Sequence, residues 1–146
     1  MPEGLVDRAA DAAQLTPRVL RVLVVEDDPE TRHFYMGVLA ADGFLTHEAH
    51  NGFQAFAKAI ETLPDLVLTD IAVPGLDGIE LCRKLRGDPR TRAVRVLAVT
   101  GYDDRHYPDR VLEAGADHVL LKPLDAAVLV AEARRLVMSE PAAADR

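Results

Sequence analysis

Five short apolar runs, each of strand length, recur along the chain with helical segments between them. Strands that alternate with helices are typical of a parallel sheet, because parallel strands need long crossover connections and the helices bury both sheet faces. We therefore expect an α/β fold with five strands and five helices. The five runs lie at about 20–25, 46–49, 66–69, 95–99 and 118–121.

Three aspartates mark the starts of predicted helices. An aspartate side chain in front of a helix accepts hydrogen bonds from the free backbone N–H groups of the first turn. Pro29 supports the first of these starts, since proline suits the first helical position, and Gly43 predicts where that helix ends. The predicted N-caps and helices are Asp28 with 29 to about 42, Asp77 with 78–87, and Asp125 with about 126–138.

The length and composition fit one folded domain. The chain has 146 residues, of which 49% are hydrophobic, enough for one proper core. We place the domain at residues 18–138, with an N-terminal extension at 1–17 and a C-terminal tail at 139–146. The single cysteine, Cys82, excludes an internal disulfide, fits a reducing cytoplasm and is interpreted as an apolar packing residue.

The charge and the N-terminal sequence narrow the classes of function. A net charge of −7 argues against a dedicated nucleic-acid binder, which normally has a basic surface. The N-terminus carries acidic residues and lacks a long apolar run, so we expect neither a secretory signal nor a membrane segment. We expect a soluble, cytoplasmic protein whose partners are other proteins and a cation.

Polar residues follow four of the five predicted strands. In open α/β sheets the ligand sits outside the carboxyl ends of the strands, so side chains at these ends can share one pocket. A single polar residue at a strand end is ordinarily a turn or cap residue. That simpler interpretation fails for Asp70, because Asp77 is the residue placed to cap the following helix. The candidates are Glu26 and Asp27, Asp70, Thr100, and Lys122.

The chemistry of this set favours a magnesium-dependent phosphoryl site. Three convergent carboxylates repel one another unless a cation lies among them, and Mg²⁺ is held by one or two carboxylates, waters and phosphate oxygens. Lys122 and the Thr100 hydroxyl are donors that stabilise phosphoryl oxygens. Asp70 is then the nucleophile, whose carboxylate attacks phosphorus to form an acyl phosphate.

Several spaced motifs together resemble the receiver domain of two-component response regulators. The resemblance covers about residues 18–138, and its motifs occur in the family's order and spacing. They are VLVVEDD (22–28), NG (51–52), DLVLTDIAVPGLDG (65–78), VLAVTG (96–101) and GADHVLLKPL (115–124).

The resemblance implies a role for each site residue. It makes Asp70 the phosphoacceptor and places Mg²⁺ on Glu26, Asp27, Asp70 and the backbone carbonyl of Ala72. Thr100 and Lys122 would contact the phosphoryl group, and the Lys122–Pro123 bond would be cis. The implied fold is a flavodoxin-like three-layer (βα)5 sandwich with strand order 2-1-3-4-5. The phosphoryl group would come from a histidine kinase or phosphotransfer protein, and the output would act on a downstream protein or through a homodimer.

Four positions stand out against the usual family pattern. Val119 stands where the family usually has an aromatic residue that rotates inward on phosphorylation. Alanine and tyrosine, at positions 72 and 102, flank the expected phosphorylation site. Pro108 lies within the expected fourth helix and lacks a backbone donor, so that helix should begin late or bend.

The leading hypothesis is a phosphorylation-controlled signalling module whose covalent chemistry is its own phosphorylation and dephosphorylation, without enzymatic turnover of a separate substrate. An alternative, motivated by Val119 and Pro108, is a receiver-like interaction module that works independently of phosphorylation. A phosphatase of the haloacid-dehalogenase kind would need a second aspartate two residues after the nucleophile, where this chain has Ala72.

Overall fold

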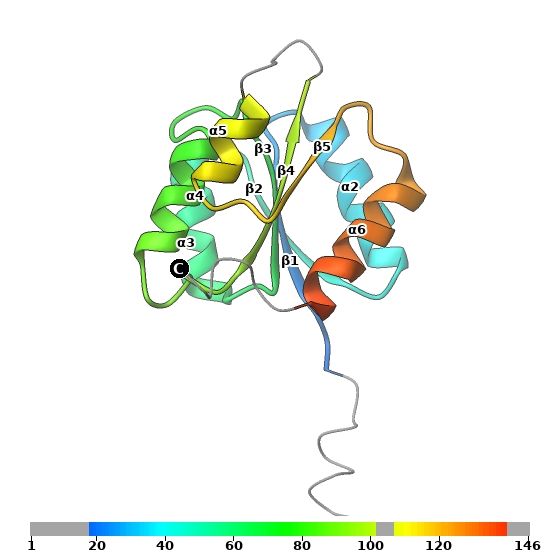
Figure 1. Ribbon diagram of the computed structural model, residues 1–146. Coiled ribbons are helices and arrows are strands. Elements are labelled where there is room, and N and C mark those ends of the chain that lie inside the picture. The colour runs from blue at the N-terminus through cyan, green and yellow to red at the C-terminus, as the bar shows by residue number, and fades with distance from the viewer. Residues whose placement is uncertain (1–17, 102–106, 140–146) are drawn as a thin grey trace, which may run out of the picture.

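A computed structural model describes residues 18–101 and 107–139 of the chain. Within these residues five parallel strands form one sheet (Figure 1). Each strand begins and ends within about one residue of the predicted apolar run. The strands are β1 (Arg21–Val25), β2 (Leu45–Ala49), β3 (Leu66–Asp70), β4 (Arg95–Thr100) and β5 (His118–Leu121).

Five helices connect and follow these strands, as the alternation predicts. The helices are α2 (Pro29–Ala41), α3 (Gly52–Thr62), α4 (Gly78–Gly87), α5 (Tyr107–Glu113) and α6 (Ala126–Met138).

The sheet has the strand order β2-β1-β3-β4-β5, which confirms the flavodoxin-like topology that the resemblance implied. The side chains of β3 are buried along its whole length, whereas β5 at the edge is only partly buried. The in-register pairing of β1 with β3 and of β3 with β4 brings the carboxyl ends of these strands to one edge of the sheet. The next strand in sequence, β2, lies on one side of β1, and the later strands β3, β4 and β5 lie on the other. A ligand site is expected where the strand order changes direction in this way.

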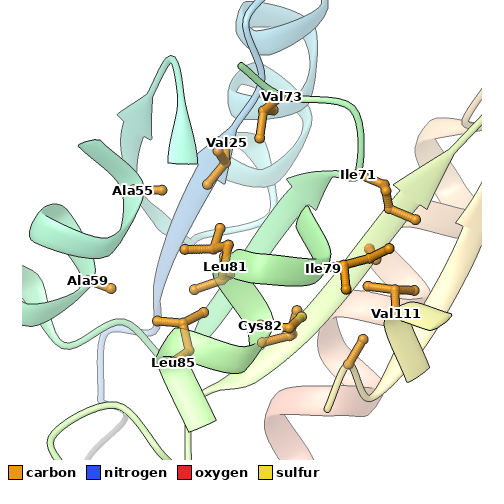
Figure 2. Packing of buried hydrophobic residues seen from close by; sticks show 14 of the residues in the cluster. Val25, Ala55, Ala59, Ile71, Val73, Ile79, Leu81, Cys82, Leu85 and Val111 are labelled. Atoms are coloured by element: carbon orange, nitrogen blue, oxygen red, sulfur yellow. The ribbon is translucent and has the colours of Figure 1, made fainter. Parts of the chain in front are cut away.

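Helices cover both faces of the sheet and produce three layers. Figure 1 shows α3, α4 and α5 on one face and α2 and α6 on the other. Two hydrophobic clusters fill the spaces between the layers. In the first, Leu81, Cys82 and Leu85 of α4 pack with Val25 of β1, with α3 and with Val111 of α5 (Figure 2). In the second, residues such as Leu39 and Leu129 pack α2 and α6 on the opposite face.

The three predicted helix caps are confirmed. The carboxylate of Asp28 accepts from the Thr31 N–H at 2.9 Å, and that of Asp77 accepts from the Glu80 N–H at 2.9 Å. Asp125 accepts from two backbone N–H groups at the start of α6. These bonds satisfy donors that a helix cannot satisfy itself, which explains where the helices begin.

Helix α5 is short, and Pro108 is its second residue. The residues just before it, 102–106, lie outside the described part of the chain, so the late start stays a prediction. Position 102 lies outside the described residues. So do the N-terminal extension and nearly all of the proposed C-terminal tail, which the structure describes only at Ser139.

Cys82 is fully buried as a free thiol, and burial raises its pKa to about 12. This supports a packing role, because the nucleophilic thiolate is disfavoured there. Across residues 18–101 and 107–139, every helix is too short or too polar to span a bilayer.

Candidate functional site

Backbone hydrogen bonds continue the sheet beyond the ends of its strands and fix three of the predicted site residues. The Glu26 N–H donates to the Ala49 carbonyl at 3.1 Å, and the Lys122 N–H donates to the Thr100 carbonyl at 2.8 Å. Asp70 is the last residue of β3, where it pairs with Val99. Glu26, Asp70 and Lys122 are thus held at the same edge of the sheet.

Lys122 joins the two buried acids. Its Nζ lies 2.5 Å from Asp70 Oδ2 and 3.2 Å from Glu26 Oε1. Glu26 is 2% exposed and Asp70 is 9% exposed, so the two carboxylates lie in a region that is poor in water. Burial by itself lowers the pKa of Lys122, but the hydrogen bond and the charge of Asp70 outweigh it, and the pKa is raised. The ammonium therefore stays charged and compensates the acids.

Glu26 has an unusual electrostatic environment. Burial, reinforced by the charge of Asp70, raises the pKa of Glu26 to about 7, although Lys122 opposes the change. Its Oε1 atom faces Lys122, whereas Oε2 is buried and lacks a hydrogen-bond partner within the described chain. A buried carboxylate oxygen in this position can accept a further donor or ligate a cation.

Both carboxylate oxygens of Asp70 are engaged. Oδ2 faces Lys122, and Oδ1 accepts from the backbone N–H of Ala72 at 3.0 Å. Asp70 is not an N-cap, because Asp77 caps α4. The carboxylate is consequently oriented by a backbone donor and a cation at the rim of the sheet.

The loop after Asp70 is held from both sides. The Gly52 N–H at the start of α3 donates to the Pro74 carbonyl at 3.1 Å, and the Gly78 N–H donates to the Ile71 carbonyl at 2.7 Å. A Cβ atom on Gly52 would lie 2.0 Å from the Leu76 carbonyl oxygen, so this close approach requires glycine.

The other predicted site residues lie at the same edge but have different surroundings. Asp27 is exposed, and Ala72 lies on the exposed part of the loop after β3. Thr100 is 1% exposed, and its Oγ1 donates to the Gly101 carbonyl at a long 3.4 Å. The Lys122–Pro123 bond is cis, as the resemblance implied.

The described residues contain no group of three acidic, histidine or cysteine side chains arranged to hold a metal ion. The structure joins Glu26 and Asp70 through Lys122, whereas Asp27 is exposed. In this arrangement the ammonium of Lys122 supplies positive charge between the two buried carboxylates.

A cleft of about 560 Å³ adjoins the site through Lys122. Its wall on α2 includes Phe34 and the buried Tyr35, and the segment after β5 forms another part of the wall. The complete lining is Glu30, Thr31, Phe34, Tyr35, Gly101, Lys122, Pro123 and Leu124.

Sequence reasoning missed one buried residue beside the site, Arg32 of α2. It is 5% exposed, and its guanidinium donates to the backbone carbonyl of Glu26 at 2.8 Å. The signal was its spacing, because Arg32 lies three and seven residues before Tyr35 and Leu39, the other buried residues of α2. An arginine on the apolar stripe of a helix indicates a specific partner.

Comparisons with known proteins identify the family. The family model of the response regulator receiver domain matches residues 22–134. The response regulator PleD of Caulobacter vibrioides is 39% identical over 116 residues, which are 80% of this chain and 26% of PleD. The DNA-binding response regulator MtrA of Mycolicibacterium smegmatis is 40% identical over 114 residues, which are 78% of this chain and 49% of MtrA. The chain thus spans about a quarter to a half of these relatives.

A solved structure agrees with the sequence comparisons. It is the receiver domain of the sensor histidine kinase PA1611 from Pseudomonas aeruginosa PAO1, with a magnesium ion coordinated in its active site cleft. It is 28% identical to this chain with a TM-score of 0.78, and the match covers 84% of this chain and all of that one. The fold and the sequence agree, and the chain belongs to the response regulator receiver domain family of two-component systems.

Proposed function

We propose that Asp70 accepts a phosphoryl group from a histidine kinase or phosphotransfer protein, in a reaction that requires Mg²⁺. The observation that carries the proposal is the contact of Lys122 Nζ with both Asp70 and Glu26 at the carboxyl edge of the sheet. Two buried acids that share one lysine leave negative charge that a second cation can compensate.

The transfer forms a bond between a carboxylate oxygen of Asp70 and phosphorus. The bond between phosphorus and the donor's imidazole nitrogen breaks, and its electron pair remains on that nitrogen. The product is an aspartyl phosphate. Lys122 and Thr100 supply donors to the phosphoryl oxygens, since the ammonium is already at Asp70 and the long bond of Thr100 yields readily to a better acceptor.

The donor set fits Mg²⁺. Glu26 Oε2 is a buried carboxylate oxygen with no hydrogen-bond partner in the described chain, and exposed Asp27 follows it directly. Mg²⁺ keeps several waters and needs one or two protein carboxylates, so a cluster of three acids is not required. Glu26, Asp70, Asp27 and the Ala72 carbonyl are the residues proposed to hold it. When bound, the ion neutralises charge on the transferring phosphoryl group.

The experiment is phosphorylation by a small phosphodonor, followed by intact-protein mass spectrometry. We expect Mg²⁺-dependent addition of one phosphoryl group to the wild type and none to D70N. The matched control is D77N in the same loop, because asparagine also caps helices and Asp77 has no proposed chemical role. Equal labelling of D70N and D77N would refute the proposal.

The alternative of a phosphorylation-independent module predicts a different result. Binding of a downstream partner would then be the same with and without a beryllofluoride mimic of the phosphoryl group. We favour phosphorylation control, because the family model matches residues 22–134, a range that contains all the proposed site residues. A partner whose affinity is unchanged by the mimic would support the alternative.

A further inference from the structure

Arg32 is a buried cation that the proposed chemistry does not use. It lies on the face of α2 that packs against the sheet, with Tyr35 and Leu39. Arginine is rarely buried unless its donors are satisfied, so its contacts indicate what it is there to hold. Those contacts lead to the backbone of the acidic site residue Glu26.

The guanidinium of Arg32 completes the backbone anchoring of Glu26. The Glu26 N–H donates to the Ala49 carbonyl of β2 at 3.1 Å, and the Glu26 carbonyl accepts from Arg32 at 2.8 Å. The backbone is thus fixed at both of its polar atoms, one by a strand and one by a helix. The Glu26 side chain is free of Arg32 and faces Lys122.

A second donor of Arg32, the Nε atom, is only loosely engaged. This atom lies 3.6 Å from Glu48 Oε1, beyond hydrogen-bond distance, and has no hydrogen-bond partner within the described chain. An ion pair with Glu48 at this distance does not by itself account for a buried arginine. The hydrogen bond from Arg32 to the Glu26 carbonyl, at 2.8 Å, is closer than the contact with Glu48.

We propose that Arg32 is a positioning residue of the phosphorylation site, which aims the Glu26 carboxylate by fixing the backbone of that residue. This inference rests on the proposed function, since it assumes that Glu26 helps to hold Mg²⁺. Partners that orient a metal ligand commonly affect metal affinity although they never touch the ion.

The sign of the effect separates positioning from simple electrostatics. Removing a positive charge near a cation site strengthens cation binding by Coulomb's law. Removing a positioning residue weakens binding, because Glu26 is then no longer held in place. R32M, which keeps much of the side-chain length and loses the charge, therefore gives opposite results under the two explanations.

Arg86 of α4 supplies the matched control. It is also largely buried, donates to the Gly115 carbonyl at 2.9 Å and pairs with Asp117 at 3.0 Å. Its backbone partners lie in the turn between α5 and β5 and in the segment before β4, away from the acids of the site. R86M should lower stability and leave Mg²⁺ binding unchanged.

The test is Mg²⁺ binding to the full chain by isothermal titration calorimetry, with no phosphodonor present. We expect R32M to raise the Kd for Mg²⁺ about 10-fold, R32K to recover part of the loss, and R86M to keep the wild-type Kd. Tighter binding by R32M, or an equal change in R32M and R86M, would overturn the inference. If R32M does not fold, R32K and R86K are compared in the same way, and an equal Kd for both would overturn it.

Amide hydrogen exchange in Mg²⁺-free protein gives a second measure that does not depend on the ion. In R32K the amides around Glu26 should exchange faster, while those of β4 keep their wild-type protection. An unchanged rate around Glu26 would contradict the positioning role. Wild-type protein that binds no Mg²⁺ would instead count against the proposed function, so the two failures are distinguishable.

Discussion

At the scale of single residues, Glu26 shows how burial controls a charge. Its pKa rises from 4.5 to about 7 because burial and the charge of Asp70 disfavour the ionised form. Between these values the folded state binds more protons than the unfolded state, so this group makes stability fall as pH rises. Its stabilising contribution is complete below pH 4.5 and is lost as pH passes about 7.

We predict that E26Q removes this pH dependence. In Mg²⁺-free buffer, the free energy of unfolding of the wild type should fall relative to that of E26Q as pH rises from 4.5 to 8, by up to about 3 kcal/mol. Urea denaturation at several pH values measures the free energy of unfolding of both proteins. Parallel pH profiles for the two proteins would show that Glu26 is not perturbed by its surroundings.

Gly52 is the residue that permits close approach of α3 to the loop after Asp70. We predict that G52A destabilises the fold by about 1–3 kcal/mol, because the new methyl group meets the Leu76 carbonyl oxygen and displaces the loop. G37A is the matched control. Its Cβ would meet nothing within 4 Å, so it should stabilise α2 by about 0.5–1 kcal/mol. Equal denaturation midpoints for the two variants would refute the contact.

At the scale of elements, each helix whose N-cap the sequence predicted begins at a side chain that satisfies its first turn. The N-cap of α6 is Asp125, which accepts from the Ala127 and Val128 N–H groups at 2.8 and 3.2 Å. This bonding is local and involves the next three residues alone. That is why the start of the helix could be predicted from the sequence.

We predict that D125A lowers the free energy of unfolding by about 1 kcal/mol, since two backbone donors lose their acceptor. D125N should retain most of the stability, because its amide oxygen can replace the carboxylate. Chemical denaturation compares the three proteins. The capping role fails if D125A is as stable as the wild type.

The strand β5 carries the main departure from the usual family pattern. Val119 is partly buried and packs against the cluster that fills the α3, α4 and α5 face. A valine has no ring to rotate between two positions, so its contribution here is packing. On the neighbouring strand β4, Ala98 pairs with Val119, and the buried Thr100 pairs with Leu121 of β5. The proposed phosphorylation therefore has no aromatic side chain at position 119 through which to act on this face.

At the scale of the whole molecule, what could be predicted depends on whether the information is local. Apolar runs located the strands, because a buried parallel strand consists of consecutive apolar residues. Lys122 contacts Asp70, 52 positions away in the sequence, and Glu26, 96 positions away. Such distant contacts follow from the strand order, and the strand order was inferred from the resemblance to receiver domains rather than from periodicity. The Arg32 bond to the Glu26 carbonyl was not predicted. Every residue has a backbone carbonyl, so the sequence does not show which carbonyl a buried arginine binds.

The residues of the candidate site were proposed from the sequence, which did not predict their relative burial. Glu26 and Asp27 are neighbours in the sequence, yet one is buried against Lys122 and the other is exposed. Adjacent residues at the end of a strand can differ in burial, and the composition of the motif does not say which of the two is buried. Only the folded edge of the sheet assigns the buried position to Glu26.

The central claim is that Asp70 forms the aspartyl phosphate. The direct measurement is borohydride reduction of the phosphorylated chain, which converts an aspartyl phosphate to homoserine, followed by peptide mass spectrometry. We predict homoserine at position 70, in a yield that depends on Mg²⁺ and falls in K122A. Homoserine at Asp27 or Asp77 instead, or an unmodified Asp70 in a chain that has taken up phosphate, would contradict it.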